Sequence, residues 1–171
     1  MNIFGSLQKI IEKNRLEKIV KLQNPTALHV TLYYFWKHLS EDDMIAIKDK
    51  IDTIRPNIKD GKLNLGDFRY FLHWNRAIFY LTPKTDLNLN GFNKAFEGLF
   101  HKETEENKLT YIPHITLFKV KDLKEYERFR PLFEKEVKWF LNDFWKLDYF
   151  ENVNLYCVDS DNKPEMQKGM Y

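Results

Sequence analysis

The sequence predicts an α+β fold in which antiparallel strands and amphipathic helices occur in two similar halves. Short runs of aromatic and β-branched residues bounded by turns predict the strands, and apolar residues at helical spacing predict the helices. The same order of strand, helix and further strands occurs twice, starting from His-Val-Thr-Leu at residues 29–32 and His-Ile-Thr-Leu at residues 114–117, which lie 85 positions apart. We therefore expect one internally duplicated domain over residues 1–171, with lobes near residues 25–82 and 108–158.

The first half begins with a helical pattern. Apolar residues recur at helical spacing over residues 5–22, which predicts a helix broken near Asn14. Residues 28–36 form an apolar run that is too short for a typical helix and predicts a strand. Ser40 is the expected N-cap of the next helix, because acidic residues fill the first turn after it. This helix should end before Pro56, since proline disrupts a helix interior.

An antiparallel sheet is predicted after this helix. Strand patterns cover residues 62–65, 68–74 and 76–81, and the last two are joined by a tight turn around Asn75. Apolar residues then fall on one helical face over residues 89–100.

The second half repeats this order. Polar residues 102–108 predict a loop, and residues 111–120 predict a strand. Residues 123–142 have helical spacing, with a kink or a fresh start at Pro131. Residues 147–158 supply one or two closing strands.

The composition is that of a globular protein. Hydrophobic residues make up 43% and aromatic residues 16% of the chain, and the formal net charge of +2 does not favour a long footprint on duplex nucleic acid. Cys157 is the single cysteine, which excludes an internal disulfide framework and a multi-cysteine zinc site. Residues 1–22 carry charges throughout, and no stretch approaches the roughly 18 apolar residues of a membrane span. We expect a monomer in the cytoplasm with no membrane partner.

The two His-x-Thr motifs carry the chemistry. Residues two apart on a strand share a face, so His29 lies with Thr31, and His114 with Thr116. If the halves pack about a pseudo-two-fold axis, both pairs face one cleft. Two imidazoles, with an unperturbed pKa of roughly 6.5, suit in-line displacement at phosphorus, because one accepts the proton of the attacking oxygen while the other protonates the departing ribose oxygen. The hydroxyls would hold the non-bridging phosphate oxygens, and no metal or cofactor is required.

Further residues are candidates for contact with a substrate. Tyr33, Phe35 and Phe118 continue the inward faces of the motif strands and are expected to stack on a nucleobase, the alternative being packing in the core. Tyr156 lies on the predicted closing strand and is a further candidate. The basic residues of 9–21 are interpreted as a solvated helix face, the alternative being contact with an RNA backbone.

These features resemble the 2H phosphoesterases, in particular the 2′-5′ RNA ligase-like branch, also called RNA 2′,3′-cyclic phosphodiesterases. The resemblance covers residues 25–158 and rests on the two motifs, on Pro113, on the basic Lys119 and on the predicted strand 153–156. It implies a bilobal fold with two antiparallel sheets and flanking helices around a central cleft. It also implies His29 as the acid, His114 as the base, and contact of Lys119 with phosphate. The opening strand common in this family is not expected here.

The activity implied by the resemblance is metal-independent hydrolysis of a cyclic or 2′-5′ linked nucleotide phosphodiester, with reverse ligation as a secondary activity. The substrate stays open among an RNA 2′,3′-cyclic end, 2′-5′ oligoadenylate, a cyclic dinucleotide and ADP-ribose cyclic phosphate. Two other classes of function are a catalytically silent module that binds RNA or a nucleotide, and a scaffold for protein contacts.

Overall fold

One four-stranded antiparallel sheet forms the centre of the described structure. A computed structural model describes residues 3–24, 28–34, 39–59, 61–99 and 110–144. Within these ranges the strand order is β1-β4-β3-β2, and the strands are β1 (Val20–Leu22), β2 (Leu63–His73), β3 (Arg76–Thr85) and β4 (Ile115–Val120). The mixed α/β class is therefore confirmed. The second sheet and the pseudo-two-fold relation of two lobes are not seen in these ranges.

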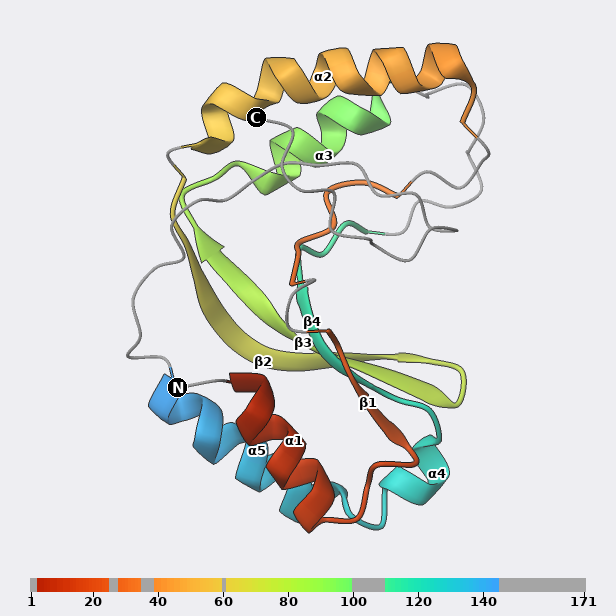
Figure 1. The fold of residues 1–171 in the computed structure, drawn as a ribbon, viewed down its shortest axis with the longest axis vertical. Coiled ribbons are helices and arrows are strands. Elements are labelled where there is room, and N and C mark those ends of the chain that lie inside the picture. Colours follow the sequence, from red (N-terminus) through yellow and green to blue (C-terminus); the bar gives the residue numbers. More distant parts are fainter. Residues whose placement is uncertain (1–2, 25–27, 35–38, 60, 100–109, 145–171) are drawn as a thin grey trace.

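Helices lie at both ends of the described structure (Figure 1). They are α1 (Ile3–Lys13), α2 (Glu41–Lys59), α3 (Leu89–Glu97), α4 (Leu123–Tyr126) and α5 (Arg130–Phe144). Helices α1 and α5 lie against one side of the sheet, whereas α2 and α3 lie together at the opposite end of the molecule (Figure 1). No helix among the described residues is both long enough and apolar enough to cross a membrane.

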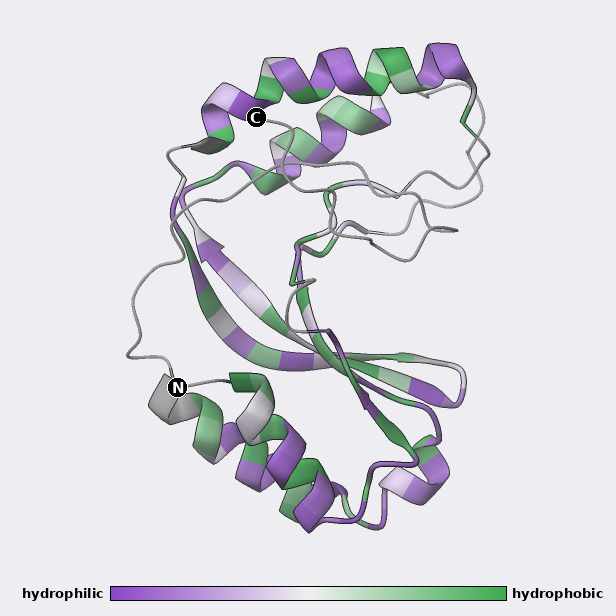
Figure 2. Cartoon of the chain, in the orientation of Figure 1, coloured by the Kyte–Doolittle hydropathy of each residue, from purple (hydrophilic) through white to green (hydrophobic). Residues whose placement is uncertain are grey.

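The described residues bury apolar side chains in two clusters. The larger cluster joins α1, α5 and one face of the sheet, and at its centre the rings of Phe79 and Phe118 stack with centroids 4.7 Å apart. The smaller cluster joins α2 to α3, and Figure 2 shows the corresponding alternation of apolar and polar residues along α2. Leu28 packs against the larger cluster and Leu32 against the smaller one. The chain that carries the first His-x-Thr motif therefore passes from one core to the other.

The first predicted helix is correct only in part. Helix α1 ends at Lys13, which confirms the break near Asn14, and Arg15 has a left-handed φ of 57° where the chain turns. The prediction that the helix continues to residue 22 is wrong, because Val20–Leu22 pairs with β4 as strand β1. Pairing with a buried strand decides the conformation of a segment whose own apolar spacing also suits a helix.

Helix α2 begins where the sequence predicts and ends later than the sequence predicts. Ser40 and Asp43 form a reciprocal cap, in which each backbone N–H donates to the other side chain, at 2.9 and 3.1 Å. The predicted end before Pro56 is wrong, because α2 continues to Lys59. Ile58 extends the apolar stripe of α2 and is 3% exposed. Burying this side chain contributes on the order of 2 kcal/mol, which offsets much of the cost of an internal proline.

The long β2–β3 hairpin replaces three shorter predicted strands. The patterns at residues 62–65 and 68–74 belong to the single strand β2, which contains a β-bulge between Leu65 and Phe68. The tight turn around Asn75 is confirmed, because His73 pairs with Arg76. Strand β3 extends beyond the predicted end to Thr85.

The later elements are confirmed in part where the structure describes them, because β4 begins at Ile115 instead of residue 111 and α3 ends at Glu97, before the predicted residue 100. Helix α3 starts at Leu89 with Asn88 as its N-cap. The fresh start at Pro131 is confirmed, because α4 ends at Tyr126 and α5 begins at Arg130. The predicted loop 102–108 and the predicted strands 147–158 lie outside the described residues.

We expect the substitution Glu136→Gln to destabilise the protein by loosening α5 from α1. The Glu136 carboxylate accepts hydrogen bonds from Lys13 Nζ at 2.7 Å and from Asn14 Nδ2 at 3.2 Å. The Lys13 contact, followed by that of Asn14, lowers the pKa of the Glu136 carboxyl despite its partial burial. The variant should lose about 1 kcal/mol of unfolding free energy at neutral pH.

The pH dependence of this loss follows from the lowered pKa. The stabilisation is complete above the carboxyl pKa of the unfolded chain and disappears as pH falls through the lower pKa of the folded state. Urea unfolding of wild type and Glu136→Gln from neutral to acidic pH measures this difference, with Glu17→Gln as the control. A difference that persists in acid would contradict the explanation.

Candidate active site

The two His-x-Thr motifs lie side by side in antiparallel orientation. Val30 forms an isolated antiparallel bridge with Ile115, and these are the middle residues of the two motifs. In an antiparallel register centred on this bridge, His29 lies opposite Thr116 and Thr31 lies opposite His114. A backbone that is extended on both sides of this bridge would place all four side chains on the same face.

The bridge also sets the spacing of the polar groups. Residues directly opposite on antiparallel strands have Cβ atoms roughly 5 Å apart, and diagonal neighbours lie about 7–8 Å apart. In this register the two histidines are diagonal neighbours, since His29 is opposite Thr116 and His114 is two residues before Thr116 in the chain. Imidazoles at this separation would leave room between them for a group of the size of a phosphate.

Strand β4 aligns both motifs. On one edge it pairs with β3, and on the other edge it pairs first with β1 and then with the Val30 segment. The pairing continues past β1, because the Gln23 N–H donates to the Leu117 carbonyl at 2.8 Å. The side-chain amide of Asn93 on α3 also donates to the Leu32 carbonyl at 2.7 Å. The first motif is therefore held by β4 on one side and by α3 just beyond it.

The His114 ring has a defined orientation. Its Nδ1 lies 2.7 Å from the Ile112 carbonyl oxygen, which can only accept, so Nδ1 carries the proton. Phe71 and Tyr80 form edge contacts with the ring at centroid distances of 5.4 Å each. Nε2 of neutral His114 is consequently the nitrogen with a free lone pair. His29, on the less enclosed segment, is exposed.

The two threonines and the residue Tyr111 differ in how their hydroxyls are placed. Thr31 and Thr116 are half-buried, and in the described part of the chain their hydroxyls make no hydrogen bond to protein groups. The Tyr111 hydroxyl is buried without a partner among the described residues, and burial raises its pKa to about 12. Tyr111 therefore remains a neutral phenol, whereas the threonines can donate to a ligand.

A β-bulge in β4 changes which residues share the face of His114. Phe79 pairs with Phe118, but the next residue, Tyr80, pairs with Thr116, so Leu117 is the extra residue of β4. The expectation that Phe118 lines the site is wrong, because Phe118 is fully buried in the core with Leu117. Lys119 is exposed, and its register places it on the face of Thr116.

Tyr33 is the one other predicted contact residue that lies in the part of the chain described by the structure. Tyr33 packs against the α2–α3 cluster, where burial and, to a lesser extent, the charge of Glu97 raise its pKa. Phe35 and Tyr156 lie outside the described residues.

The sequence did not identify the groups that orient His114. Phe71 and Tyr80 lie on strands whose alternating pattern places them on the face of Thr116, and this alternation is the only sequence signal for them. The Ile112 carbonyl has no sequence signal, because any residue supplies a backbone oxygen.

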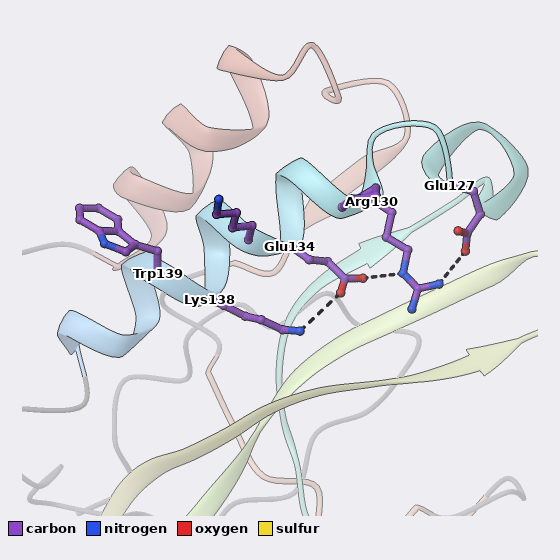
Figure 3. A pocket seen from close by; sticks show the side chains of 7 residues that line it. Glu127, Arg130, Glu134, Lys138 and Trp139 are labelled. Atoms are coloured by element: carbon purple, nitrogen blue, oxygen red, sulfur yellow. Dashed lines mark hydrogen bonds and ion pairs between the residues drawn. The ribbon is translucent and has the colours of Figure 1, made fainter.

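A separate hollow lies beside α5 and does not include the motifs. It is lined by Glu127, Arg130, Glu134, Lys138 and Trp139 among others (Figure 3). Arg130 donates to Glu127 at 2.8 Å, to Glu134 at 2.9 Å and to the hydroxyl of Tyr70, and the Glu127 contact is the main cause of its raised pKa. Because the guanidinium of Arg130 is paired on several sides, we interpret this hollow as structural.

Across the described ranges, no group of three His, Cys, Asp or Glu residues is placed to hold a metal ion.

The fold and the paired motifs define a mixed α/β protein with two His-x-Thr segments joined on one sheet. A family model described as the 2′-5′ RNA ligase superfamily matches residues 4–149. The chain belongs to this superfamily, which is part of the 2H phosphoesterases. Comparisons with curated proteins and with solved structures gave no match.

The contact of His114 with the Ile112 carbonyl predicts one tautomer. We expect neutral His114 to be protonated on Nδ1 and unprotonated on Nε2, because a carbonyl oxygen cannot donate a hydrogen bond. Long-range ¹H–¹⁵N NMR correlation at a pH where the histidines are neutral measures this, and the spectrum of His114→Gln assigns the signals. Protonation on Nε2 would show that the Ile112 contact does not hold the ring in solution.

Proposed function

We propose that the protein is a phosphodiesterase that hydrolyses a cyclic or 2′-5′ linked nucleotide phosphodiester by acid and base catalysis with His29 and His114. The observation that carries this proposal is the antiparallel bridge between the middle residues of the two motifs. This bridge supports a site in which two imidazoles and two hydroxyls share one face, and membership of the 2′-5′ RNA ligase superfamily favours a phosphodiester as the bond that is broken.

The proposed reaction is an in-line displacement. A water oxygen attacks phosphorus while Nε2 of neutral His114 accepts a proton from this water. The bond from phosphorus to the ribose oxygen breaks on the opposite side, and cationic His29 gives its proton to the departing oxygen. The nucleotide leaves with one phosphomonoester and one new hydroxyl. The Ile112 carbonyl supports the role of His114, because it leaves Nε2 with the lone pair that a base needs.

The threonines are proposed to bind the non-bridging oxygens. In the register set by the bridge, each hydroxyl lies opposite one imidazole, so the phosphate has a donor on each side of the line of attack. Negative charge grows on these oxygens in the transition state, and fixed donors stabilise it. The catalytic chemistry assigned to these residues uses no metal ion.

The first test measures turnover in EDTA of a nucleoside 2′,3′-cyclic phosphate, an RNA with a cyclic phosphate end, a 2′-5′ dinucleotide and a cyclic dinucleotide. We expect His29→Ala and His114→Ala each to lower kcat by about 10²–10⁴-fold, because each removes one proton transfer. Thr31→Val and Thr116→Val should each cost about 10–10²-fold through loss of a phosphate donor.

Thr53→Val on α2 is the matched control for removal of a hydroxyl, because Thr53 bonds only to the backbone of its own helix at 2.8 Å. Its turnover should equal that of wild type. Histidine variants that match wild type, or a wild type that binds these compounds without turning any over, would exclude this mechanism in favour of a silent binding module.

A second test assigns the acid and the base. A nucleotide 4-nitrophenyl phosphodiester has a leaving group that needs no protonation, so His29→Ala should recover most of the wild-type rate on it. His114→Ala should remain slow on this substrate as well, because the attacking water still needs a base. Steady-state rates on the activated and natural diesters measure the difference, and recovery in His114→Ala instead would reverse the two roles.

A further inference from the structure

Strand β2 forms an edge of the sheet that no other described strand covers. It stands last in the order β1-β4-β3-β2 and is 11 residues long. His73 and Arg76 close a two-residue turn, and the residues that close such a turn are hydrogen-bonded to each other. Because bonded and non-bonded pairs alternate along antiparallel strands, Tyr70 and Leu72 turn their backbone N–H and C=O groups away from β3. A long open edge of this kind pairs readily with a further strand.

The residues of this edge also expose apolar side chains. Tyr70 and Leu72, which share one face of β2, are 38% and 62% exposed, and Trp74 at the turn is 91% exposed. Trp74 has a left-handed φ of 57°, which is unfavourable for a bulky residue. The fold of a single copy gives no reason for an exposed and strained tryptophan at this turn. Such a residue is typical of an interface.

A row of charged side chains with alternating sign flanks the same edge. Glu127, Arg130, Glu134 and Lys138 follow one another from the end of α4 to the middle of α5 (Figure 3). Arg130 donates to the Tyr70 hydroxyl, and Glu134 and Lys138 line a hollow together with Tyr70, so the row lies beside β2. The row is negative at one end and positive at the other. A two-fold axis reverses it, so the carboxylates of one copy meet the cations of a second copy.

We propose that a second copy of this chain covers the β2 edge, and that the two β2 strands pair antiparallel about a two-fold axis at Phe71. In this register Tyr70 pairs with Leu72 of the second copy, and Trp74 lies beside Phe68 of the second copy. The axis is perpendicular to the sheet, so both candidate active sites lie on the same face of the joined sheet. This inference is independent of the proposed function. It replaces the monomer expected from the sequence, because composition does not show which strand lies at an edge.

The surface is large enough for a specific dimer. Each of the three side chains Tyr70, Leu72 and Trp74 has on the order of 200 Å² of surface, so their exposed parts amount to roughly 400 Å² per copy. Two copies contribute about 800 Å², and the paired backbones and charged rows add to this, which reaches the roughly 1,000 Å² of a specific interface. The self-complementary charges favour a second copy over a different protein as the occupant.

Sedimentation over a range of protein concentrations tests the dimer. We expect wild type to form dimers and Leu72→Lys to raise the dissociation constant about 100-fold, because the dimer then holds a lysine at the joined edge in both copies. Leu72→Pro removes an N–H that points away from β3, so each copy should keep its fold and lose the pairing. The control is Ile45→Lys on α2, since Ile45 is 59% exposed, and this variant should dimerise like wild type.

Charge reversals test the position of the axis. In the proposed dimer Glu127 faces Lys138 of the second copy, so Glu127→Lys sets like charges opposite each other, as does Lys138→Glu. Each variant alone should dimerise about tenfold more weakly than wild type. An equimolar mixture of the two variants should recover the wild-type affinity, because opposite charges then meet at both contacts. Contacts within one copy are the same in the mixture as in the separate variants, so a merely structural role gives no recovery, and a mixture that stays weak excludes this axis.

Hydrogen exchange at the amides of Tyr70 and Leu72 identifies the covered edge. These amides should exchange slowly in the dimer and fast after dilution to the monomer. A wild type that stays monomeric overturns the inference, and slow exchange in that monomer would show that another segment of the chain covers the edge. A dimer that survives both Leu72→Lys and Leu72→Pro also overturns it, because the copies then meet elsewhere. Turnover of the nucleotide diesters decides the proposed function separately.

Discussion

Antiparallel pairing on both edges of β4 is the constraint on which the rest of the structure depends. One edge of β4 pairs with β3, and the other edge pairs with β1 and then with Val30. The core side of β4 is fixed by Leu117 and Phe118, which are buried against α1, α5 and the sheet. Because the backbone of β4 cannot shift without disturbing this core, the side chains on its other face keep their positions. The same packing that stabilises the fold therefore orients the groups proposed for catalysis.

The bulge at Leu117 allows β4 to fill the core with some side chains and to present others on the face of the candidate site. A regular strand would place Phe118 beside His114 and Thr116, and would place Lys119 in the core. The extra residue instead puts two consecutive apolar side chains, Leu117 and Phe118, on the core side and returns Lys119 to the face of Thr116. A buried ammonium group would carry a large desolvation cost, so the bulge allows the core to be filled and the charge to stay in water.

Local sequence signals predicted the parts of the fold that depend on local interactions. The Ser40 cap, the turn at Asn75 and the restart at Pro131 each follow from the chemistry of a few neighbouring residues, and each is present. The predictions are wrong where contacts between residues distant in the sequence determine the local conformation. Val20–Leu22 becomes a strand because β4 pairs with it, and α2 passes Pro56 because Ile58 reaches a buried cluster.

The candidate site shows the same difference between local and distant contacts. Strand alternation predicts that His29 shares a face with Thr31, and His114 with Thr116. The bridge that brings the two motifs together depends on tertiary structure. The groups that orient His114 come from three separate places, namely Phe71, Tyr80 and a backbone carbonyl. The net charge is likewise a sum over the whole chain, so a value of +2 does not reveal that five cationic residues lie on the strands of the sheet. Because screening limits exposed charges to a range of about 8–10 Å, the local arrangement decides which anion binds. A nearly neutral protein can therefore disfavour a long duplex and still carry a locally positive surface on its sheet.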